Sequence, residues 1–180
     1  MTTYLALLRG INVGGANKVP MSELRTLFED LGYGDVRTYL QSGNVIFDGR
    51  SATSRKLAAE VEDAISKAFD LTISVIVRTQ RKLERVAAGN PFPTEGVKPS
   101  SLHVMFLAEH ASAKAVKSLD SDRSPPDEFE VKDSEIFLRF PNGSGRSKLT
   151  IDYFEKKLGT RATARNWNTV VKVLELMHRT

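Results

Sequence analysis

The chain has 180 residues, 41% hydrophobic and 27% charged, which is enough for a buried core and ordinary for a globular protein. It contains no cysteine, which excludes disulfides, zinc–thiolate sites and cysteine nucleophiles and predicts a reducing, cytoplasmic location. The net charge of +4 permits an anionic partner without requiring one.

The first half of the chain alternates short apolar runs with segments of helical periodicity. The run Tyr4 to Leu8 suits a buried strand but is too short for a signal peptide or a membrane span, so we expect no membrane association. Pro20 suits the first turn of a helix, and Gly32 suits its end. In chain order we predict a strand at 3–9, a helix at 20–32, two strands within 35–47, a helix ending near 68, a strand at 72–77 and a helix at 79–88.

This order, β-α-β-β-α-β followed by a helix, is typical of the ferredoxin-like unit, an antiparallel sheet with two helices on one face. Residues 91–100 are rich in proline and are predicted to be a linker. The same order follows in strands at 101–108, 128–131, 135–140 and 161–165, with helices at 112–119, 147–159 and 166–179. The fold class is therefore α+β, with two ferredoxin-like halves in tandem, 1–90 and 101–180.

Polar, glycine-rich segments stand at several predicted strand ends. "RGINVGGANK" follows the first strand, "QSGN" makes a turn, "GSGRSK" precedes a helix, and "ARNWN" joins a strand to a helix. The start of a helix binds anions readily, which makes the residues after Gly145 a candidate anion site. The alternative is a glycine-rich hairpin exit in which Ser147 caps the helix.

We predict that these segments form a composite site for a small anionic ligand. The candidate binding residues are Arg9, Asn12, Lys18, Gln41, Ser42, Asn44, Ser147, Lys148, Arg165 and Asn166. Asparagine and glutamine also form turns and helix caps without any ligand, and this interpretation competes strongly at Asn44, Asn166 and Asn168. Either Asn166 or Asn168 is expected to cap the last helix. From Arg139 to the end of the chain the net charge is +6, which favours an anion-binding side.

No spacing of histidines or carboxylates suggests a metal site, and no cofactor motif is present, so we expect neither. The three histidines, His103, His110 and His178, have no serine or cysteine partner that would mark a nucleophile–base pair. Trp167 is expected to pack in the core.

The motifs resemble those of one family over nearly the whole chain. "LLRGINVGGANKVPMSELRTLFEDLGY", "VRTYLQSGNVIF", "NPF" and "GSGRSKLT…TARNWNTVVKVLEL" are similar to the DUF1697 family, a domain of unknown function. The resemblance implies a bacterial-type soluble protein of two ferredoxin-like halves, and it implies no activity. The residues that carry it include Arg9, Gly10, Asn12, Gly14, Gly15, Lys18, Gln41, Ser42, Gly43, Asn44, Ser147, Lys148, Arg165, Asn166, Trp167 and Asn168.

Three classes of function stay open on the sequence. A small-anion binding module would use Arg and Lys charges and glycine amides. A nucleic-acid binder would stack bases on strand aromatics, for which the first half offers only Tyr4 and Phe47. An enzyme acting on a phosphorylated metabolite would have to depend on electrostatic stabilisation, because no nucleophile–base pair can be read.

Overall fold

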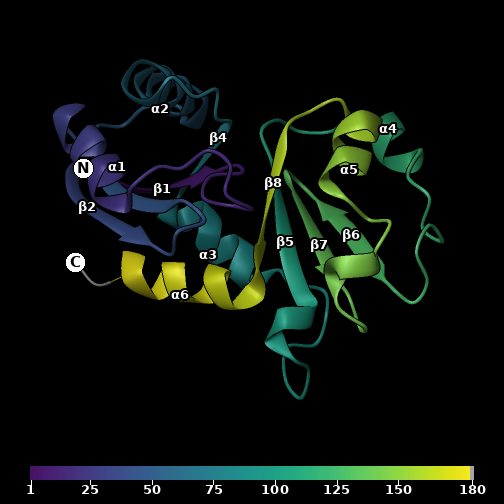
Figure 1. Ribbon diagram of the computed structural model, residues 1–180. Coiled ribbons are helices and arrows are strands. Elements are labelled where there is room, and N and C mark those ends of the chain that lie inside the picture. The colour runs from purple at the N-terminus through teal and green to yellow at the C-terminus, as the bar shows by residue number, and fades with distance from the viewer. Residues whose placement is uncertain (179–180) are drawn as a thin grey trace. The chain divides into compact units, whose positions relative to one another are not determined.

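The computed structural model describes residues 1–178, apart from the side chain of Pro99. It contains two four-stranded antiparallel sheets with helices, which confirms the predicted α+β class with two halves in tandem. The chain divides into two compact units: Met1–Glu84 with the end of the chain from Val173, and Arg85–Lys172. Each unit holds one sheet and the two helices that cover one face of it (Figure 1).

The first sheet has the strand order β2-β3-β1-β4, with the first and third strands at its centre as predicted. Two helices, α1 after the first strand and α2 after the third, cover one face of it (Figure 1). Its elements are β1 (Thr2–Leu8), α1 (Met21–Asp30), β2 (Gly34–Tyr39), β3 (Asn44–Gly49), α2 (Ser54–Phe69) and β4 (Val75–Thr79).

Alternation along β1 divides its side chains between the two faces of the sheet. Tyr4 and Leu8 point towards the helices, and the Tyr4 ring stacks on Phe47 of β3 with centroids 5.5 Å apart. Leu5 and Leu7 point to the opposite face and are buried as well. Because both faces are covered, β1 is a continuous apolar run rather than an alternating one.

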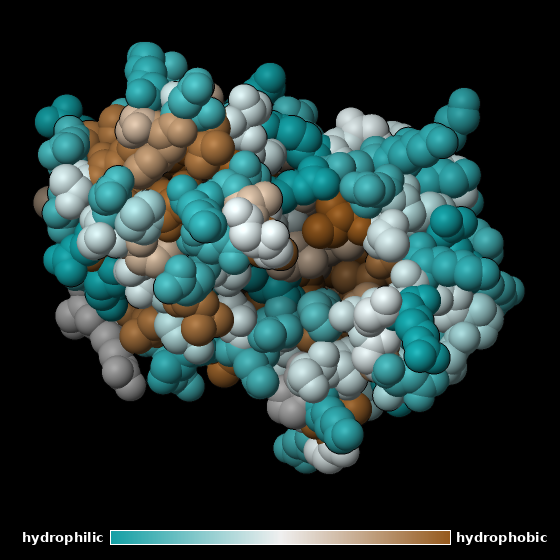
Figure 2. All heavy atoms as spheres, viewed as in Figure 1, coloured by the Kyte–Doolittle hydropathy of each residue, from teal (hydrophilic) through white to brown (hydrophobic). Residues whose placement is uncertain are grey.

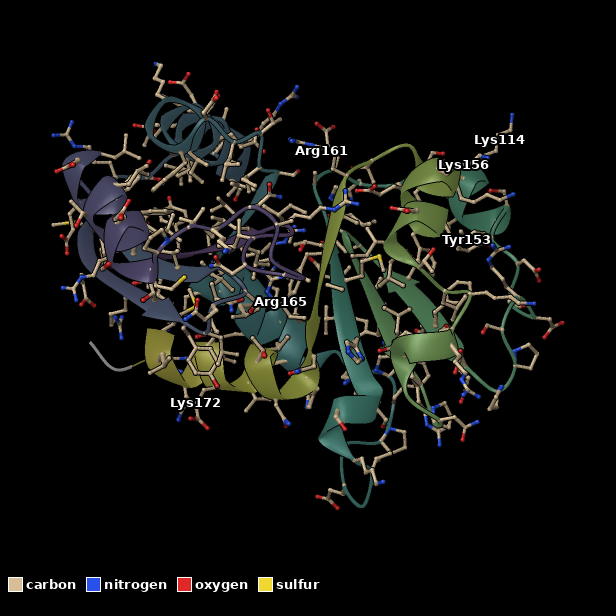
Figure 3. The ribbon with its side chains drawn as sticks, in the orientation of Figure 1. Lys114, Tyr153, Lys156, Arg161, Arg165 and Lys172 are labelled. Carbon is tan, nitrogen blue, oxygen red and sulfur yellow. The ribbon has the colours of Figure 1, made fainter. Side chains whose placement is uncertain are left out.

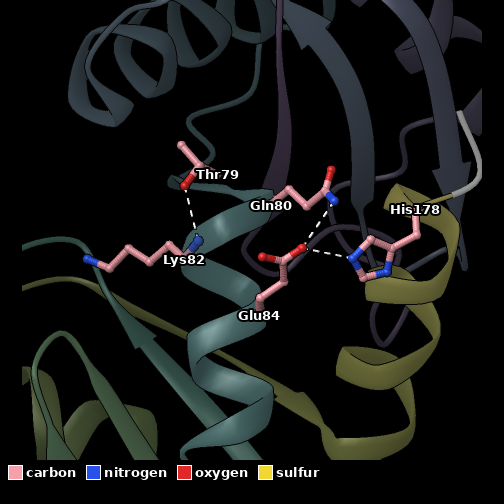
Figure 4. Close-up of polar contacts among 5 residues, drawn as sticks. All are labelled: Thr79, Gln80, Lys82, Glu84 and His178. Carbon is pink, nitrogen blue, oxygen red and sulfur yellow. Dashed lines mark hydrogen bonds and ion pairs between the residues drawn. The ribbon is translucent and has the colours of Figure 1, made fainter.

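Two helices belong partly to each unit: α3 (Gln80–Ala88) divides after Glu84, and α6 (Trp167–Met177) divides before Val173. The end of α6 is held within the first unit by polar contacts. Arg37 of β2 donates a hydrogen bond to the Leu176 carbonyl. His178 lies 2.8 Å from a Glu84 carboxylate oxygen that also accepts a bond from Gln80 (Figure 4). These bonds lower the pKa of Glu84, so the carboxylate stays charged to a more acidic pH.

The second sheet repeats the topology of the first, in the order β6-β7-β5-β8. Short α4 and longer α5 cover one face, where Phe154 and Leu158 pack on Met105 and Leu138. Its elements are β5 (Leu102–Leu107), α4 (Ala113–Lys117), β6 (Glu128–Lys132), β7 (Glu135–Arg139), α5 (Ile151–Leu158) and β8 (Ala162–Asn166).

The sequence repeat and the compact units divide the chain differently. The repeat separates 1–90 from 101–180, whereas the units separate at Glu84 and at Val173. Within the predicted linker 91–100, the chain is irregular until a 3-10 turn at Pro99–Ser101. The predicted last helix, 166–179, matches α6 closely. The last residue of the predicted range, 179, lies outside the described residues.

Gly43, in the turn between β2 and β3, is required on two physical grounds. Its φ is +79°, a conformation that side chains rarely adopt. A Cβ atom there would lie 2.7 Å from Ile11 Cδ1 and 2.8 Å from Leu8 Cβ. Gly14 also has a positive φ, +59°, but a Cβ there would meet nothing within 4 Å.

We therefore predict that Gly43→Ala lowers the free energy of unfolding by about 3 kcal/mol, from backbone strain plus crowding. The matched Gly14→Ala should cost only about 1 kcal/mol, from strain alone. Urea denaturation followed by circular dichroism measures both. Equal losses in the two variants would show that the crowding at Gly43 is relieved without cost.

Candidate functional site

The side chain of Asn12 organises the glycine-rich loop that follows β1. Its Oδ1 accepts the Val19 amide and its Nδ2 donates to the Val19 carbonyl, both at 2.9 Å. The Asn17 side chain donates to the Gly10 carbonyl at 3.1 Å and closes the other end of the loop. Asn12 is therefore bonded within the protein, whereas residues 13–18 of the loop, which include Val13, the two glycines and Lys18, are exposed to solvent.

The same asparagine ties this loop to the turn between β2 and β3. Asn12 Nδ2 also donates to the Gln41 carbonyl at 2.9 Å. Asn44 is fully buried, and its side chain donates to the Tyr39 carbonyl at 2.8 Å and to Ser42 Oγ at 3.3 Å. The structure thus brings together the "RGINVGGANK" and "QSGN" segments, with Asn12 and Asn44 serving as turn formers.

Two further residues of these segments, Arg9 and Leu40, differ in their exposure to solvent. Arg9 is half-buried where β1 ends, and its backbone amide donates to the Ser74 carbonyl. Leu40 is exposed and has a φ of +59°, a strained conformation for a bulky side chain. The turn keeps this strain because its bonds to Asn12 and Asn44 determine its shape.

In the second unit, the prediction that Arg146, Ser147 and Lys148 open a helix is wrong. Ser144–Arg146 forms a 3-10 turn, and α5 begins only at Ile151. Thr150 is the cap, because its hydroxyl accepts the Tyr153 amide at 3.2 Å. Ser147 instead accepts the amide of Leu149 at 3.0 Å, in a turn of its own. One amide at the start of α5 is therefore bonded to the threonine side chain, and Ser147 and Lys148 lie before the helix rather than in its first turn.

The "GSGRSK" loop lines a polar hollow instead. The hollow has a volume of about 590 Å³, within the usual range for small-molecule sites. One wall comes from the loop after β7 and the other from the segment before β6. The lining residues are Ser124, Pro125, Pro126, Asp127, Asn142, Gly143, Gly145, Arg146 and Ser147.

Hydrogen bonds hold the two walls of this hollow together. Ser124 Oγ accepts the Lys148 amide at 3.1 Å and donates to Asp127 Oδ2 at 2.8 Å. Arg123 Nε donates to the Lys148 carbonyl at 2.9 Å, and its guanidinium lies 4.0 Å from the centroid of the Tyr153 ring (Figure 3 labels this tyrosine on α5). The backbone of Lys148 thus joins the two walls, although Lys148 itself does not line the hollow and is exposed.

Arg165, on β8, is a buried cation rather than a surface one (Figure 3). It is only 8% exposed, and it donates to Thr163 Oγ1 at 3.0 Å and to the Ala164 carbonyl at 2.8 Å. Burial lowers the pKa of its guanidinium to about 10, which leaves it charged at neutral pH. Its neighbour Asn166 caps α6, because Oδ1 accepts the Thr169 amide at 2.8 Å. Trp167 is buried, as predicted.

The ten predicted binding residues therefore fall into two groups within separate units. The first unit holds the segments with Arg9, Asn12, Lys18, Gln41, Ser42 and Asn44, and the second holds those with Ser147, Lys148, Arg165 and Asn166. Within the second unit, Ser147 lines the hollow whereas Arg165 and Asn166 do not. A single site shared by all four segments stays a prediction.

A protein-family model matches most of the length of the chain. The family model described as "Protein of unknown function (DUF1697)" matches residues 1–137. The chain belongs to the DUF1697 family. No curated protein matches this DUF1697 chain.

One solved structure extends the fold comparison to the whole chain. It is described as the structure of conserved bacterial protein SP0830 from Streptococcus pneumoniae and superposes with a TM-score of 0.74. The two are 23% identical, and the match covers 98% of each chain. At this identity the likeness shows that the two chains share a fold over both units, and it says nothing of a ligand.

Sequence reasoning missed half of the hollow in this DUF1697 chain. Ser124 and Asp127 lie in "LDSDRSPPDEFE", which on its own indicates a solvated loop. The tight turn between β6 and β7 could have indicated this wall. It sets a register in which Glu128 pairs with Arg139, so the segment before β6 lies beside the segment after β7. Among residues 1–178, no cluster of three metal-binding side chains is present, and no helix is long and apolar enough to cross a membrane.

We predict that Arg165→Met lowers the free energy of unfolding by about 1–3 kcal/mol, because the acceptors on Thr163 and Ala164 lose a charged donor. Urea denaturation measures this, with Arg81→Met, at an exposed position of α3, as the control. If Arg165→Met is as stable as the parent protein, the structural role is refuted and Arg165 returns as a candidate ligand anchor.

His103, on β5, should make stability depend on pH. Its ring packs edge-on against Phe140, and its buried Nδ1 has no hydrogen-bond partner among the described residues. Desolvation lowers the pKa of His103 below its usual 6.5, so the unfolded chain takes up a proton first on acidification. Its stabilising effect is therefore complete above about pH 6.5 and is lost as the pH falls towards the folded-state pKa.

The variant His103→Gln, which cannot take up a proton, should accordingly lose less stability than the parent protein between pH 8 and pH 5. Melting temperatures across this range measure the difference. His110→Gln, at an exposed position, is the control and should not reduce the loss. An equal slope for His103→Gln and the parent protein would contradict the assignment.

Proposed function

We propose that this DUF1697 protein is a binding module for a small anionic ligand, and that the ligand occupies the hollow between residues 124–127 and 142–147 of the second unit. The observation that carries the proposal is Arg146 in the lining of the hollow. Arg146 is exposed, and among residues 1–178 no carboxylate pairs with it. An arginine free of internal partners can form bidentate hydrogen bonds to a phosphate or carboxylate.

The backbone around Arg146 supports the same ligand chemistry. Gly143 has φ +83° and ψ 157°, a region reserved almost wholly for glycine. A Cβ at Gly143 or Gly145 would meet nothing within 4 Å, so these glycines leave open space beside the arginine. Close approach of a ligand to bare backbone is a common use of glycine in binding loops.

Other groups of the hollow favour a ligand that also carries hydroxyls. Asp127 retains acceptor capacity beyond the one bond from Ser124, and Asn142 offers both a donor and an acceptor. A bare anion would be repelled by Asp127, whereas a phosphorylated polyol could place its phosphate at Arg146 and a hydroxyl at the carboxylate. Polarity on both walls therefore supports a sugar phosphate more than inorganic phosphate.

The nucleic-acid alternative has less support. The strand aromatics available for base stacking in the first unit, Tyr4 and Phe47, pack against the helices in the core. They cannot form the exposed platform by which a ferredoxin-like sheet binds RNA.

Titration of the protein with ribose 5-phosphate, ribose and inorganic phosphate, followed by amide NMR shifts, tests the proposal. We expect saturable shifts at 142–147 with ribose 5-phosphate, and binding at least tenfold weaker in Arg146→Gln, from the loss of a charge-assisted pair. The melting temperature should stay unchanged, because Arg146 is exposed.

Arg81→Gln removes the same charge from an exposed position of α3 and is the control. Equal affinity in Arg146→Gln and the parent protein would refute the role of Arg146. Equal weakening in both variants would indicate a nonspecific effect of net charge rather than a site.

A further inference from the structure

A second concave surface lies in the first unit, along the outer side of α1 and α2. Its volume is about 550 Å³ and it is shallow and open to solvent. Figure 2 shows apolar surface gathered over these two helices, at the upper left of the view. The groove is lined by Ser22, Glu23, Thr26, Leu27, Asp30, Leu31, Ala64, Lys67, Ala68 and Phe69.

The floor of this groove is apolar, and part of it is formed by small side chains. Ala64 and Ala68 lie one turn apart on α2 and let a partner approach the helix closely. Leu31 and Phe69 are only partly buried against the core, so each keeps apolar surface in contact with water. Covering such surface is favourable at about 25 cal/mol per Å² of apolar area.

The charged side chains on the rim of the groove that have no ion-pair partner among the described residues are all acidic. Glu23 and Asp30 lie two turns apart on α1, and neither has an ion-pair partner among the described residues. Lys67, on the opposite rim, is 2.6 Å from Asp63 of its own helix. The wall formed by α1 is therefore acidic, although the chain as a whole carries +4.

We propose that this groove is a docking site for a basic amphipathic helix of a partner protein. The apolar face of that helix covers Leu31, Ala68 and Phe69, and its lysines or arginines pair with Glu23 and Asp30. A helix matches the dimensions, because α1 has 10 residues and so offers a wall about 15 Å long. Apolar anchors recurring every three or four residues, with basic residues beside them, are the pattern of helix-in-groove recognition. The proposal is independent of the hollow in the second unit.

Selection from a displayed library of random peptides of about 16 residues, long enough for four helical turns, tests this proposal. The full chain is the bait, and Ala68→Arg is the bait for counter-selection. Arginine at this exposed position adds bulk and positive charge to the groove and keeps helix propensity. Ser66→Arg adds the same side chain to α2 outside the lining and is the matched control.

We expect enriched peptides with leucine-like anchors at helical spacing and with lysine or arginine beside them. Fluorescence anisotropy of one such peptide should give affinity at least tenfold weaker for Ala68→Arg than for Ser66→Arg. The double variant Glu23→Gln, Asp30→Asn should weaken binding more than Glu29→Gln does on the same helix.

Four results would overturn the proposal. Enrichment of acidic or uncharged peptides would refute the charge complementarity. Peptides that bind Ala68→Arg as well as the parent protein, or no enrichment over the counter-selected bait, would show that the groove is not the docking site. A dimer in sedimentation that Ala68→Arg abolishes would assign the groove to a second copy of this chain.

Discussion

The antiparallel pairing of one central strand with two neighbours determines which loops meet in each unit. In the first unit Leu8 pairs with Val75 and Leu7 with Asn44, so the loop after β1 meets the turn before β3. In the second unit Leu102 and Glu128 both pair with Arg139, so the segments before β6 and after β7 meet. The contact between the "RGINVGGANK" and "QSGN" segments lies where β1 ends, whereas the hollow lies where β5 begins. Because β1 and β5 are equivalent strands of the repeat, the two places are at opposite ends of the repeated motif. The two clusters are therefore not copies of each other.

The same register reveals an internal correspondence that sequence identity hides. Leu8–Val75 and Leu107–Ala162 are equivalent pairs, and three residues further along β4 and β8 lie Arg78 and Arg165. Both arginines are buried, at 4% and 8% exposed, and both bond to a carbonyl one residue away, on Val77 and Ala164. A buried guanidinium at the same place in both halves is better explained by a structural constraint of the repeat than by one ligand. The internal correspondence therefore favours a structural role for Arg165, while its role in binding stays a prediction.

The apolar pattern of the sequence was sufficient for most of the elements, because a strand or helix buried on one face is periodic and a strand buried on both faces, such as β1, is a continuous apolar run. Cap chemistry limited the start of α6 to Asn166 or Asn168, since a short polar side chain is favoured there, and the structure shows that the cap is Asn166. It failed at Ser147, because two hydroxyl residues compete for one cap and local sequence does not decide between them. Thr150 is the cap because Leu149 and Phe154 must enter the core, and this depends on the packing of α5. The pairing of Ser124 with Lys148 likewise depends on tertiary register, so the hollow could not be predicted from either loop alone.

Charge and polarity separate the hollow from the groove. The hollow presents Arg146 beside Asp127 and bare backbone, which suits a ligand small enough to satisfy several polar groups at once. The groove presents Glu23 and Asp30 above an apolar floor. Binding there would be stabilised by the apolar surface area that the partner buries, and a small polar ligand has too little apolar area to contribute. The residues that line the hollow all belong to the second unit, and those that line the groove all belong to the first. The two proposals therefore require ligands of opposite charge, and a binding result at one surface does not decide the proposal made for the other.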